Sequence, residues 1–283
     1  MGPDPLDLQH LGAERVIASY LIDTEDGPAL YDCGPSSCTE RLHSALRQRG
    51  LELQDVPHLL LSHIHLDHAG AAGVLVREHP ALQVHVSEIG APHLADPSRL
   101  ERSARRLYGD AFDTLWGELA PVPEENIRIV GPDVLGLECF PSPGHASHHV
   151  CYLSGDGTLY AGDAAGVRLQ PDRTVLPPTP PPDFDLAAWY RTIDEIEERA
   201  PGRLALVHFG VADDHERHLA ELRERLADWT RRVGEGVTEE EFGESVRSDV
   251  TAIGGDVKAY EHAMPFWQSY AGLKRYWEQR RAP

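Results

Sequence analysis

Short apolar runs in the N-terminal half of the chain have the length and composition of strands. The first two, at residues 16–22 and 29–31, are separated by Gly27-Pro28, which predicts a hairpin turn. A third run, at residues 58–61, is continuous enough for a strand that is buried on both faces. Further strands are expected at residues 82–86, 127–130, 134–140, 148–153, 158–161 and 203–208.

Helical periodicity lies between and after these runs. Residues 36–49 carry Leu42 and Leu46 at i, i+4 spacing, which predicts a helix with one apolar face. Asp96-Pro97 predicts another helix start, because an acidic N-cap and a proline at the first helical position both suit a helix N-terminus. Helices are also expected at residues 69–79, at residues 185–199 and almost exclusively from residue 213 onward.

The two sets of elements are interpreted as one domain with an appendage. They span roughly residues 14–161 and 185–283, and neither a long low-complexity linker nor an internal repeat separates them. The proline-rich segment 176–182 cannot lie inside a helix or a central strand, so we expect a stiff extended loop. We predict a single domain over residues 1–283, with residues 213–283 as a mainly helical C-terminal extension.

Composition narrows the classes of partner. The formal net charge of -20 opposes binding to a long polyanion, because nucleic-acid binding depends on Lys and Arg contacts to phosphates. No apolar run approaches the roughly 20 residues that a membrane-spanning helix needs. The four cysteines form no C-x-x-C pair. A Cys33–Cys38 disulfide is conceivable, but buried free thiols in a reducing cytosol are the preferred interpretation. We therefore expect a cytoplasmic protein that binds neither nucleic acid nor membrane.

Most of the candidate chemistry lies in one segment, Ser62-His63-Ile64-His65-Leu66-Asp67-His68. It directly follows the predicted buried strand. Residues i and i+2 of an extended segment point the same way, so His63 and His65 can bind one ion together. Asp67 and His68 lie where the chain turns into the next helix, and they can face a neighbouring ion. Imidazole and carboxylate ligands suit zinc, iron or manganese. The alternative is an exposed histidine-rich loop. It fits poorly, because the segment directly follows a strand that is predicted to be buried.

Three further candidate ligands follow other predicted strands. His145 comes after strand 134–140, Asp163 after strand 158–161, and His208 at the end of the strand at 203–208. Taken singly, each would be interpreted as a hydrogen-bonded structural residue. Together with the histidine segment they complete two metal sites.

The order of these residues resembles the five sequence motifs of the metallo-β-lactamase superfamily: Asp32-x-Gly34, His63-x-His65-x-Asp67-His68, His145, Asp163 and His208. The resemblance covers roughly residues 14–210. It implies a fold of the α/β (α+β) class, the αββα sandwich, in which two sheets face each other and helices cover the outside. It also places two metal ions at one edge of the sandwich.

The resemblance further implies a role for each residue. One metal would be held by His63, His65 and His145. The second would be held by Asp67, His68 and His208, with Asp163 bridging the two and Asp32 bracing the ligand loop. The ions are expected to be divalent, zinc first with iron or manganese as alternatives. They would hold a bridging hydroxide for attack on an electrophilic centre, with Asp67 as the catalytic proton carrier.

Departures from known branches narrow the resemblance to the broad group of general hydrolases with this fold. His65 stands where the flavodiiron oxidoreductases have Glu, and Asp163 is an acid that the true β-lactamases lack. Gly166 stands where acyl-homoserine lactonases usually have Tyr. Residues 164–168 lack the Gly-Cys-Gly-Arg segment of glyoxalase II and the persulfide dioxygenases. The acidic charge disfavours the tRNA-processing branch.

We therefore expect an enzyme, a metal-dependent hydrolase that acts on a small ester, thioester or lactone. Phosphodiester hydrolysis uses the same metals and stays an alternative. Another alternative is a metal-containing binding or regulatory protein whose pocket is closed by the C-terminal helices. The expected partner is a small-molecule substrate, and a homodimer is also possible.

Three features allow both a functional and a structural interpretation. Arg99, Arg102 and Arg106 share a helical face that could bind an anionic group, although a solvated face paired with acids is preferred. The loop at 176–182 could form a rigid wall of the pocket or serve as a connector. The aromatic residues of the C-terminal helices could cap the site, form a dimer face or pack in the core.

Overall fold

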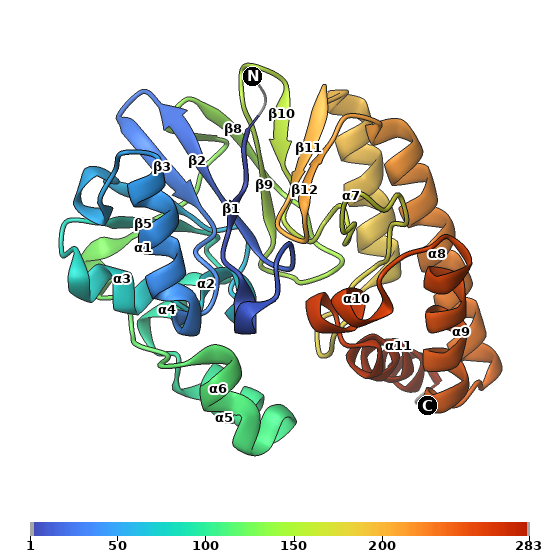
Figure 1. Cartoon of the computed structure of the whole chain (residues 1–283). Helices are drawn as coiled ribbons and strands as arrows, with labels where there is room; N and C mark the ends of the chain where they lie inside the picture. Colours follow the sequence, from blue (N-terminus) through green and yellow to red (C-terminus); the bar gives the residue numbers. More distant parts are fainter. Residues whose placement is uncertain (1–2, 282–283) are drawn as a thin grey trace.

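Two sheets lie face to face at the centre of the molecule (Figure 1). The computed structural model describes residues 3–281. The first sheet has the strand order β1-β2-β3-β4-β5-β6, with bounds Leu6–Asp7, Ala18–Thr24, Gly27–Tyr31, His58–Leu60, Gln83–Val86 and Ile127–Ile129. The second has the order β12-β11-β10-β9-β8-β7; from β7 to β12 the bounds are Asp133–Val134, Leu137–Pro141, Val150–Leu153, Thr158–Tyr160, Arg203–Leu206 and Gly210–Ala212.

Helices flank both sheets, which confirms the predicted αββα sandwich (Figure 1). On the side of the first sheet lie α1 to α6, with bounds Thr39–Gln48, Leu66–Ala69, Ala72–Glu78, Ala91–Ala95, Ser98–Tyr108 and Phe112–Trp116. On the side of the second lie α7 to α11, with bounds Leu186–Arg199, His215–Glu235, Glu239–Ala252, Val257–Ala263 and Phe266–Arg281. Over residues 3–281, none of these helices has both the length and the apolarity to cross a membrane.

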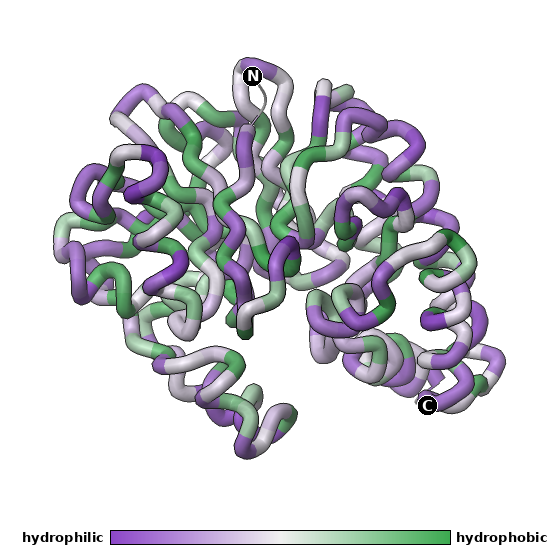
Figure 2. Tube along the Cα trace, viewed as in Figure 1, coloured by the Kyte–Doolittle hydropathy of each residue, from purple (hydrophilic) through white to green (hydrophobic). Residues whose placement is uncertain are grey.

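Apolar residues are concentrated in the strands, while the outer helices are largely hydrophilic (Figure 2). Two buried tyrosines also tie the sheets together. The hydroxyl of Tyr152 in β9 donates to the carbonyl of Leu61, 3.0 Å away, and that of Tyr20 in β2 donates to the carbonyl of Leu206, 2.6 Å away. Each bond reaches a strand end in the opposite sheet, so the ends of β4 and β11 are each tied to the facing sheet.

The C-terminal helices share the buried core of the sandwich. Leu222 and Trp229 of α8, Phe242 of α9 and Tyr276 of α11 belong to the same continuous cluster of buried apolar residues as the two sheets. An independent domain has a core of its own. The division into one domain with residues 213–283 as a helical extension stays a prediction.

The predicted position of the first hairpin turn is wrong by two residues. β2 pairs with β3 so that Thr24 faces Gly27, and the turn therefore consists of Glu25 and Asp26. Gly27 has φ 110°, a conformation that glycine adopts easily, and it marks the first residue after the turn.

The single strand predicted at residues 134–140 is in fact two strands. Leu135 and Gly136 have φ values of 57° and 83°, and this pair forms the tight turn between β7 and β8. A leucine with positive φ is rare, so its sequence gives no signal for a turn. The short strand β12 is absent from the sequence-based prediction.

Candidate metal centre

The predicted ligands lie together at one edge of the sheets, although they come from four separate segments. β4 is followed by the loop of His63 and His65 and then by the short helix α2 with Asp67 and His68. The other three ligands follow the ends of β8, β10 and β11, and they are His145, Asp163 and His208. These strand ends meet at the same edge, which explains how residues so far apart in sequence converge.

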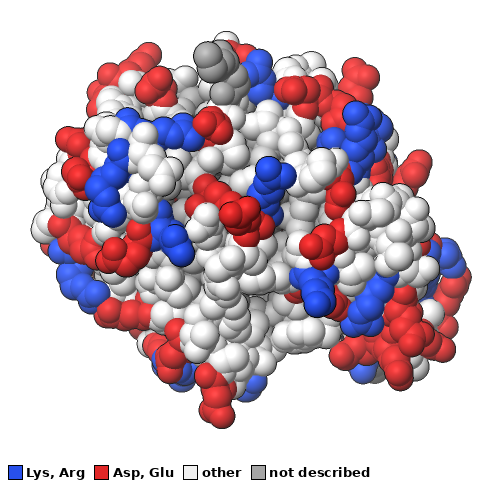
Figure 3. Space-filling view, in the orientation of Figure 1, with Lys and Arg blue, Asp and Glu red and all other residues white. Residues whose placement is uncertain are grey.

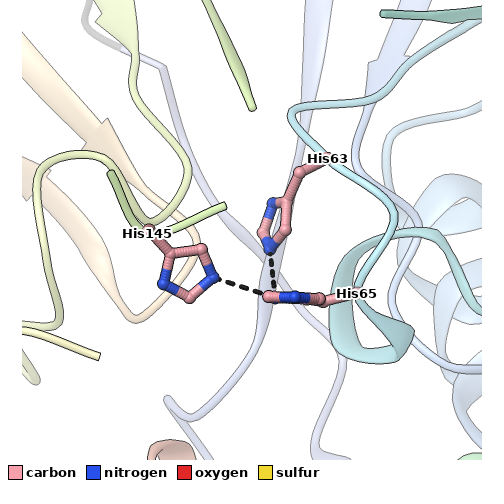
Figure 4. Close-up of side chains that lie close together, drawn as sticks. All are labelled: His63, His65 and His145. Atoms are coloured by element: carbon pink, nitrogen blue, oxygen red, sulfur yellow. Dashed lines mark hydrogen bonds between the residues drawn. The ribbon is translucent and has the colours of Figure 1, made fainter. Parts of the chain in front are cut away.

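Three imidazoles form the first group of donor atoms (Figure 4). Nδ1 of His65 lies 2.9 Å from Nε2 of His63 and 2.9 Å from Nε2 of His145. All three rings are largely enclosed, and His63 and His145 are buried. The three nitrogens therefore point into one small space.

The neighbours of these rings determine where their protons lie. Nδ1 of His145 is 2.7 Å from the carbonyl oxygen of Pro178, which can only accept, so this nitrogen carries the proton. The Ser62 hydroxyl donates to Asp32, 2.6 Å away, so its oxygen accepts from Nδ1 of His63 at 2.9 Å. In the neutral rings, Nε2 of His63 and of His145 is then unprotonated, and its lone pair faces His65. This arrangement fits a cation in the shared space.

Asp67, His68 and His208 form the second group. Oδ2 of Asp67 lies 3.3 Å from Nε2 of His208 and 3.8 Å from Nε2 of His68. Nδ1 of His208 faces the carbonyl of Val16 at 2.7 Å, and Nδ1 of His68 faces Oδ2 of Asp32 at 2.8 Å. Each Nδ1 therefore donates outward, and each Nε2 turns its lone pair toward the group.

Asp163 lies between the two groups, and its oxygens face different histidines. Oδ2 is 3.3 Å from Nε2 of His145 in the first group. Oδ1 is 3.4 Å from Nε2 of His68 and 3.7 Å from Nε2 of His208 in the second. This is the placement expected of a carboxylate that bridges two ions.

Two buried polar atoms of the cluster lack a hydrogen-bond partner. Nε2 of His68 and Oδ1 of Asp163 are fully buried, and neither forms a hydrogen bond. Burying such groups unpaired is costly, and two lone pairs that face each other are costlier still. A divalent cation is a partner for both at once, so the residues present fit the metal ions that the sequence motifs imply.

Burial and mutual charge shape the ionisation of the cluster. Burial lowers the pKa of His65 to about 4, and it also lowers the pKa values of His63 and His145. Burial opposes ionisation of Asp163, but the imidazoles of His68, His145 and His208 outweigh it and lower the pKa of the carboxyl. The first group therefore presents unprotonated imidazoles. In the second group, the carboxylates of Asp163 and Asp67 outweigh burial and raise the pKa values of His68 and His208, so a metal ion bound there would displace protons.

A model of the metallo-beta-lactamase superfamily matches residues 12–208, a span that contains all the motif residues. The chain belongs to the metallo-beta-lactamase superfamily. Members of this superfamily are typically binuclear metal hydrolases, and the fold implies divalent metal ions. The histidine and aspartate groups described above fit such ions.

Relatives with known names are distant. The chain is 26% identical over 181 residues to the metallo-beta-lactamase fold-containing protein ST1585 of Sulfurisphaera tokodaii, covering 60% of this chain and 67% of that protein. It is 24% identical over 160 residues to an N-acyl homoserine lactonase of Bacillus sp., covering 47% of this chain and 56% of the lactonase. Alignments with the curated relatives span 35% to 67% of those proteins.

Solved structures share the fold at low identity. The metallo-beta-lactamase family protein TTHA1429 of Thermus thermophilus superposes with a TM-score of 0.68 at 19% identity, covering 99% of this chain and 93% of that one. A protein named TTHA1623, in a di-iron-bound form, gives a TM-score of 0.55 at 22% identity, covering 72% of this chain and 91% of that one. Because TTHA1429 covers 99% of this chain, the superposition includes the C-terminal helices.

Several groups that position the ligands are not apparent from the sequence motifs. Ser62 joins Asp32 to His63, and the carbonyls of Val16 and Pro178 orient two ligand rings. Nε2 of His149 accepts from the backbone N–H of Asp163 at 3.1 Å. Ser62 had a signal in its place directly before the first ligand, and His149 had one in its place four residues after His145. A backbone carbonyl has none, because any residue supplies it.

A cavity of about 280 Å³ opens onto the cluster and decides two of the open interpretations. Pro178 and Pro180 to Pro182 line it, so the proline-rich loop forms a wall of the pocket. Arg99, Arg102 and Arg106 are exposed and do not line it. The aromatic residues of the C-terminal helices have different positions. Trp267 lines the cavity, while Trp229 and Tyr276 are buried in the core.

Proposed function

We propose that the protein is a binuclear metal-dependent hydrolase that cleaves a small carboxylic ester, thioester or lactone. The observation that carries the proposal is the cavity that opens onto the ligand cluster. Its charged lining residues are the acids Asp67, Asp163 and Glu261, and no Lys or Arg among the described residues lines it. A phosphodiester would therefore find no side-chain cation in the lining to pair with its charged oxygen, whereas an ester or lactone is neutral and needs none.

We assign the ligands as the geometry groups them. One ion would be held by His63, His65 and His145, the other by Asp67, His68 and His208, with Asp163 between them. When bound, two divalent ions would lower the pKa of a water molecule and polarise the substrate carbonyl. We propose zinc as the resident metal, because imidazole and carboxylate are among its usual ligands. Iron, which the name of one structural neighbour records for that protein, is the alternative.

Asp67 is the best placed residue for moving a proton. Its side chain is 22% exposed, against 4% for Asp163, and it lines the cavity. It therefore meets both the cluster and any substrate in the cavity. We assign it the transfer of a proton to the leaving group, a task that requires a proton-carrying side chain within reach of the reacting atoms.

A lactone is compatible with this pocket, although the tyrosine of acyl-homoserine lactonases is missing. Gly166 has φ 76°, and a side chain there would place Cβ 2.9 Å from Cδ1 of Leu222. A tyrosine at this position would therefore be strained and would require Leu222 to shift. Substrate binding in this chain must use other groups, and the cavity walls supply them.

The cavity also favours an enzyme over a protein with a closed pocket. Leu107 and Trp267 line it and are 47% and 37% exposed, so it reaches the surface between them. A small substrate has a route to the cluster through this opening.

The test compares kcat/KM for aryl acetates and lactones with kcat/KM for bis-aryl phosphodiesters, on protein of measured metal content. We expect the acyl substrates to be preferred and the activity to disappear on treatment with a chelator. A clear preference for the phosphodiesters would refute the substrate class and leave the metal assignment standing. Full activity in metal-free protein would refute the metal assignment.

A further inference from the structure

The cavity extends away from the ligand cluster between two parts of the chain that are distant in sequence. On one side lies the arm, which we define as α5, α6 and their connection, residues 98–116. On the other side lie α10 and α11 of the C-terminal extension. Figure 1 shows the arm and these helices facing each other below the sheets. The cavity thus has an inner end at the cluster and an outer end at the surface.

The walls of the outer part are mainly apolar. The arm contributes Leu107, Leu115 and Trp116, and the opposite side contributes Met264, Pro265 and Trp267. In Figure 3 the lower centre of the molecular face, between the arm and the C-terminal helices, carries few charged atoms, although the chain as a whole is strongly acidic. A volume of about 280 Å³ is near the lower end of the range for small-ligand pockets, which fits a small substrate.

Contacts across the cavity hold the two walls in place. Gln268 of α11 donates a hydrogen bond to the Tyr108 hydroxyl of the arm, and the rings of Tyr108 and Trp267 lie 6.3 Å apart. Deeper in, one ring nitrogen of His10 contacts the Leu115 carbonyl at 2.9 Å and the other contacts Nε2 of His262 at 3.0 Å. The arm and the C-terminal helices therefore form one pocket and not two separate surfaces.

We propose that this outer part of the cavity binds the acyl chain of the substrate, and that the chain is uncharged and apolar. The inference rests on the proposed ester-hydrolase function and adds the substrate class to it. The cluster at the inner end fixes where the scissile carbonyl lies. The chain then runs outward between Leu107 and Trp267, where it meets apolar walls and no cation that could pair with a charged terminus.

This proposal predicts a dependence on chain length. Each methylene buried against the walls contributes about 0.8 kcal/mol, or roughly a fourfold gain in binding at full burial. kcat/KM should therefore rise from acetate through butanoate to octanoate esters of one phenol. A chain that ends in a carboxylate should lose this gain, because its charge would be buried without a partner.

The variant Leu107→Arg tests the location of the chain. Leu107 is exposed on α5, and arginine is compatible with a helix, so folding should be preserved. The octanoate-to-acetate ratio of kcat/KM should fall by about tenfold, and hemiesters with a terminal carboxylate should gain relative to octanoate. Ile129→Arg is the matched control, because Ile129 is 53% exposed on β6 and does not line the cavity.

A second measurement does not depend on turnover. Binding of 2-octanone, which a hydrolase cannot cleave, is followed by calorimetry on the metal-containing protein and on both variants. We expect binding that Leu107→Arg weakens and Ile129→Arg leaves unchanged. A flat chain-length profile in an active esterase, or equal 2-octanone binding by both variants, would overturn the acyl-chain proposal. If no ester is cleaved but Leu107→Arg still weakens 2-octanone binding, the ester-hydrolase proposal fails and the apolar subsite stands.

Discussion

Nε2 of His68 lies 3.4 Å from Oδ1 of Asp163, and both atoms are buried without a hydrogen-bond partner. The other ring nitrogen of His68 is 2.8 Å from Asp32, so the nitrogen that faces Asp163 carries a lone pair in the neutral ring. In that ring form two buried acceptors face each other, and the contact needs a proton or a metal cation between them; Asp163, Asp67 and Asp32 accordingly raise the pKa of His68. The pair makes sense as two ligands of one cation, and this interpretation leads to the first prediction.

We predict about two metal ions per chain in the wild-type protein and about one in Asp163→Ala, with most activity lost. The reason is that the oxygens of Asp163 face both donor groups. Elemental analysis of untagged protein measures the metal content. Asp133→Ala removes an exposed acid on β7 and should change neither quantity. An Asp163→Ala protein with both ions and wild-type turnover would refute the bridging assignment.

Asp32→Asn should weaken metal binding while leaving the fold intact. Asp32 accepts from the Ser62 backbone and hydroxyl at 2.7 and 2.6 Å and faces Nδ1 of His68. Its φ of 48° is tolerated by asparagine, so the backbone should not change. Loss of the charge that orients His68 should reduce metal affinity roughly 10- to 100-fold. Competition with a chelator measures the affinity, and an unchanged value would show that Asp32 has no orienting role.

His148→Ala and His145→Ala should behave differently, although the two residues are close in sequence. Nε2 of His145 belongs to the first donor group, while the ring of His148 stacks on His63 at 5.9 Å and its Nδ1 accepts from the backbone of Ile64. We expect at most roughly a tenfold loss of activity in His148→Ala, and loss of metal as well as activity in His145→Ala. Equal loss of metal in both variants would mean that His148 is a ligand.

The candidate site was more predictable from the sequence than the exact course of the strands. His63 and His65 alternate along an extended segment, so their common direction follows from local geometry. The convergence of His145 and Asp163 follows from their positions after strands, once the strands are assigned to one edge. The motif order then identifies the superfamily, and the family match confirms it.

What could not be predicted depends on contacts between distant segments. Leu135 takes a left-handed conformation that its side chain disfavours, so the β7–β8 turn leaves no trace in the pattern. His10 lies near the N-terminus, yet it contacts Leu115 and His262, and no spacing rule connects three such positions. The cavity walls come from the arm and α11, which only the folded chain brings together.

Acidification should destabilise the protein in part through His218. This residue is buried in α8, and its Nε2 donates to the carbonyl of Ala165 at 2.7 Å. Burial lowers the pKa of His218 to about 4, from 6.5 for an exposed histidine. Between these values the unfolded chain binds a proton that the folded chain does not. Stability from this group is therefore present above pH 6.5 and falls as the pH drops toward 4, by about 1.4 kcal/mol per pH unit.

His218→Gln removes the titrating group but can still donate to Ala165. The unfolding free energy of this variant, measured in urea across the same pH range, should fall less steeply than that of the wild type. Contributions from other histidines and from the metals are common to both proteins and cancel in the difference. Parallel pH profiles for the two proteins would show that His218 is not held neutral by its surroundings.

Gly272 in α11 tests whether the C-terminal extension is packed against the wall of the pocket. A Cβ at this position would lie 1.9 Å from the carbonyl oxygen of Thr179 and 2.8 Å from the carbonyl carbon of Pro180, both of them backbone atoms. Thr179 is buried and its hydroxyl donates to the carbonyl of Ser269 at 3.0 Å, so the loop cannot yield easily. Gly272→Ala must therefore push α11 away from the proline-rich loop.

We predict that Gly272→Ala lowers the unfolding free energy by about 1–3 kcal/mol, the usual cost of overpacking, although alanine favours a helix. Gly243→Ala in α9 is the matched control, because a Cβ there meets only the flexible end of Arg247 at 3.1 Å. That variant should be neutral or more stable by up to roughly 1 kcal/mol. Denaturant unfolding measures both. The carbonyl of Pro178 in the displaced loop orients His145, so Gly272→Ala should also weaken metal retention, and Gly243→Ala should not. If both variants gain stability and retain metal equally, α11 is not packed against the loop, and the extension does not form part of the pocket.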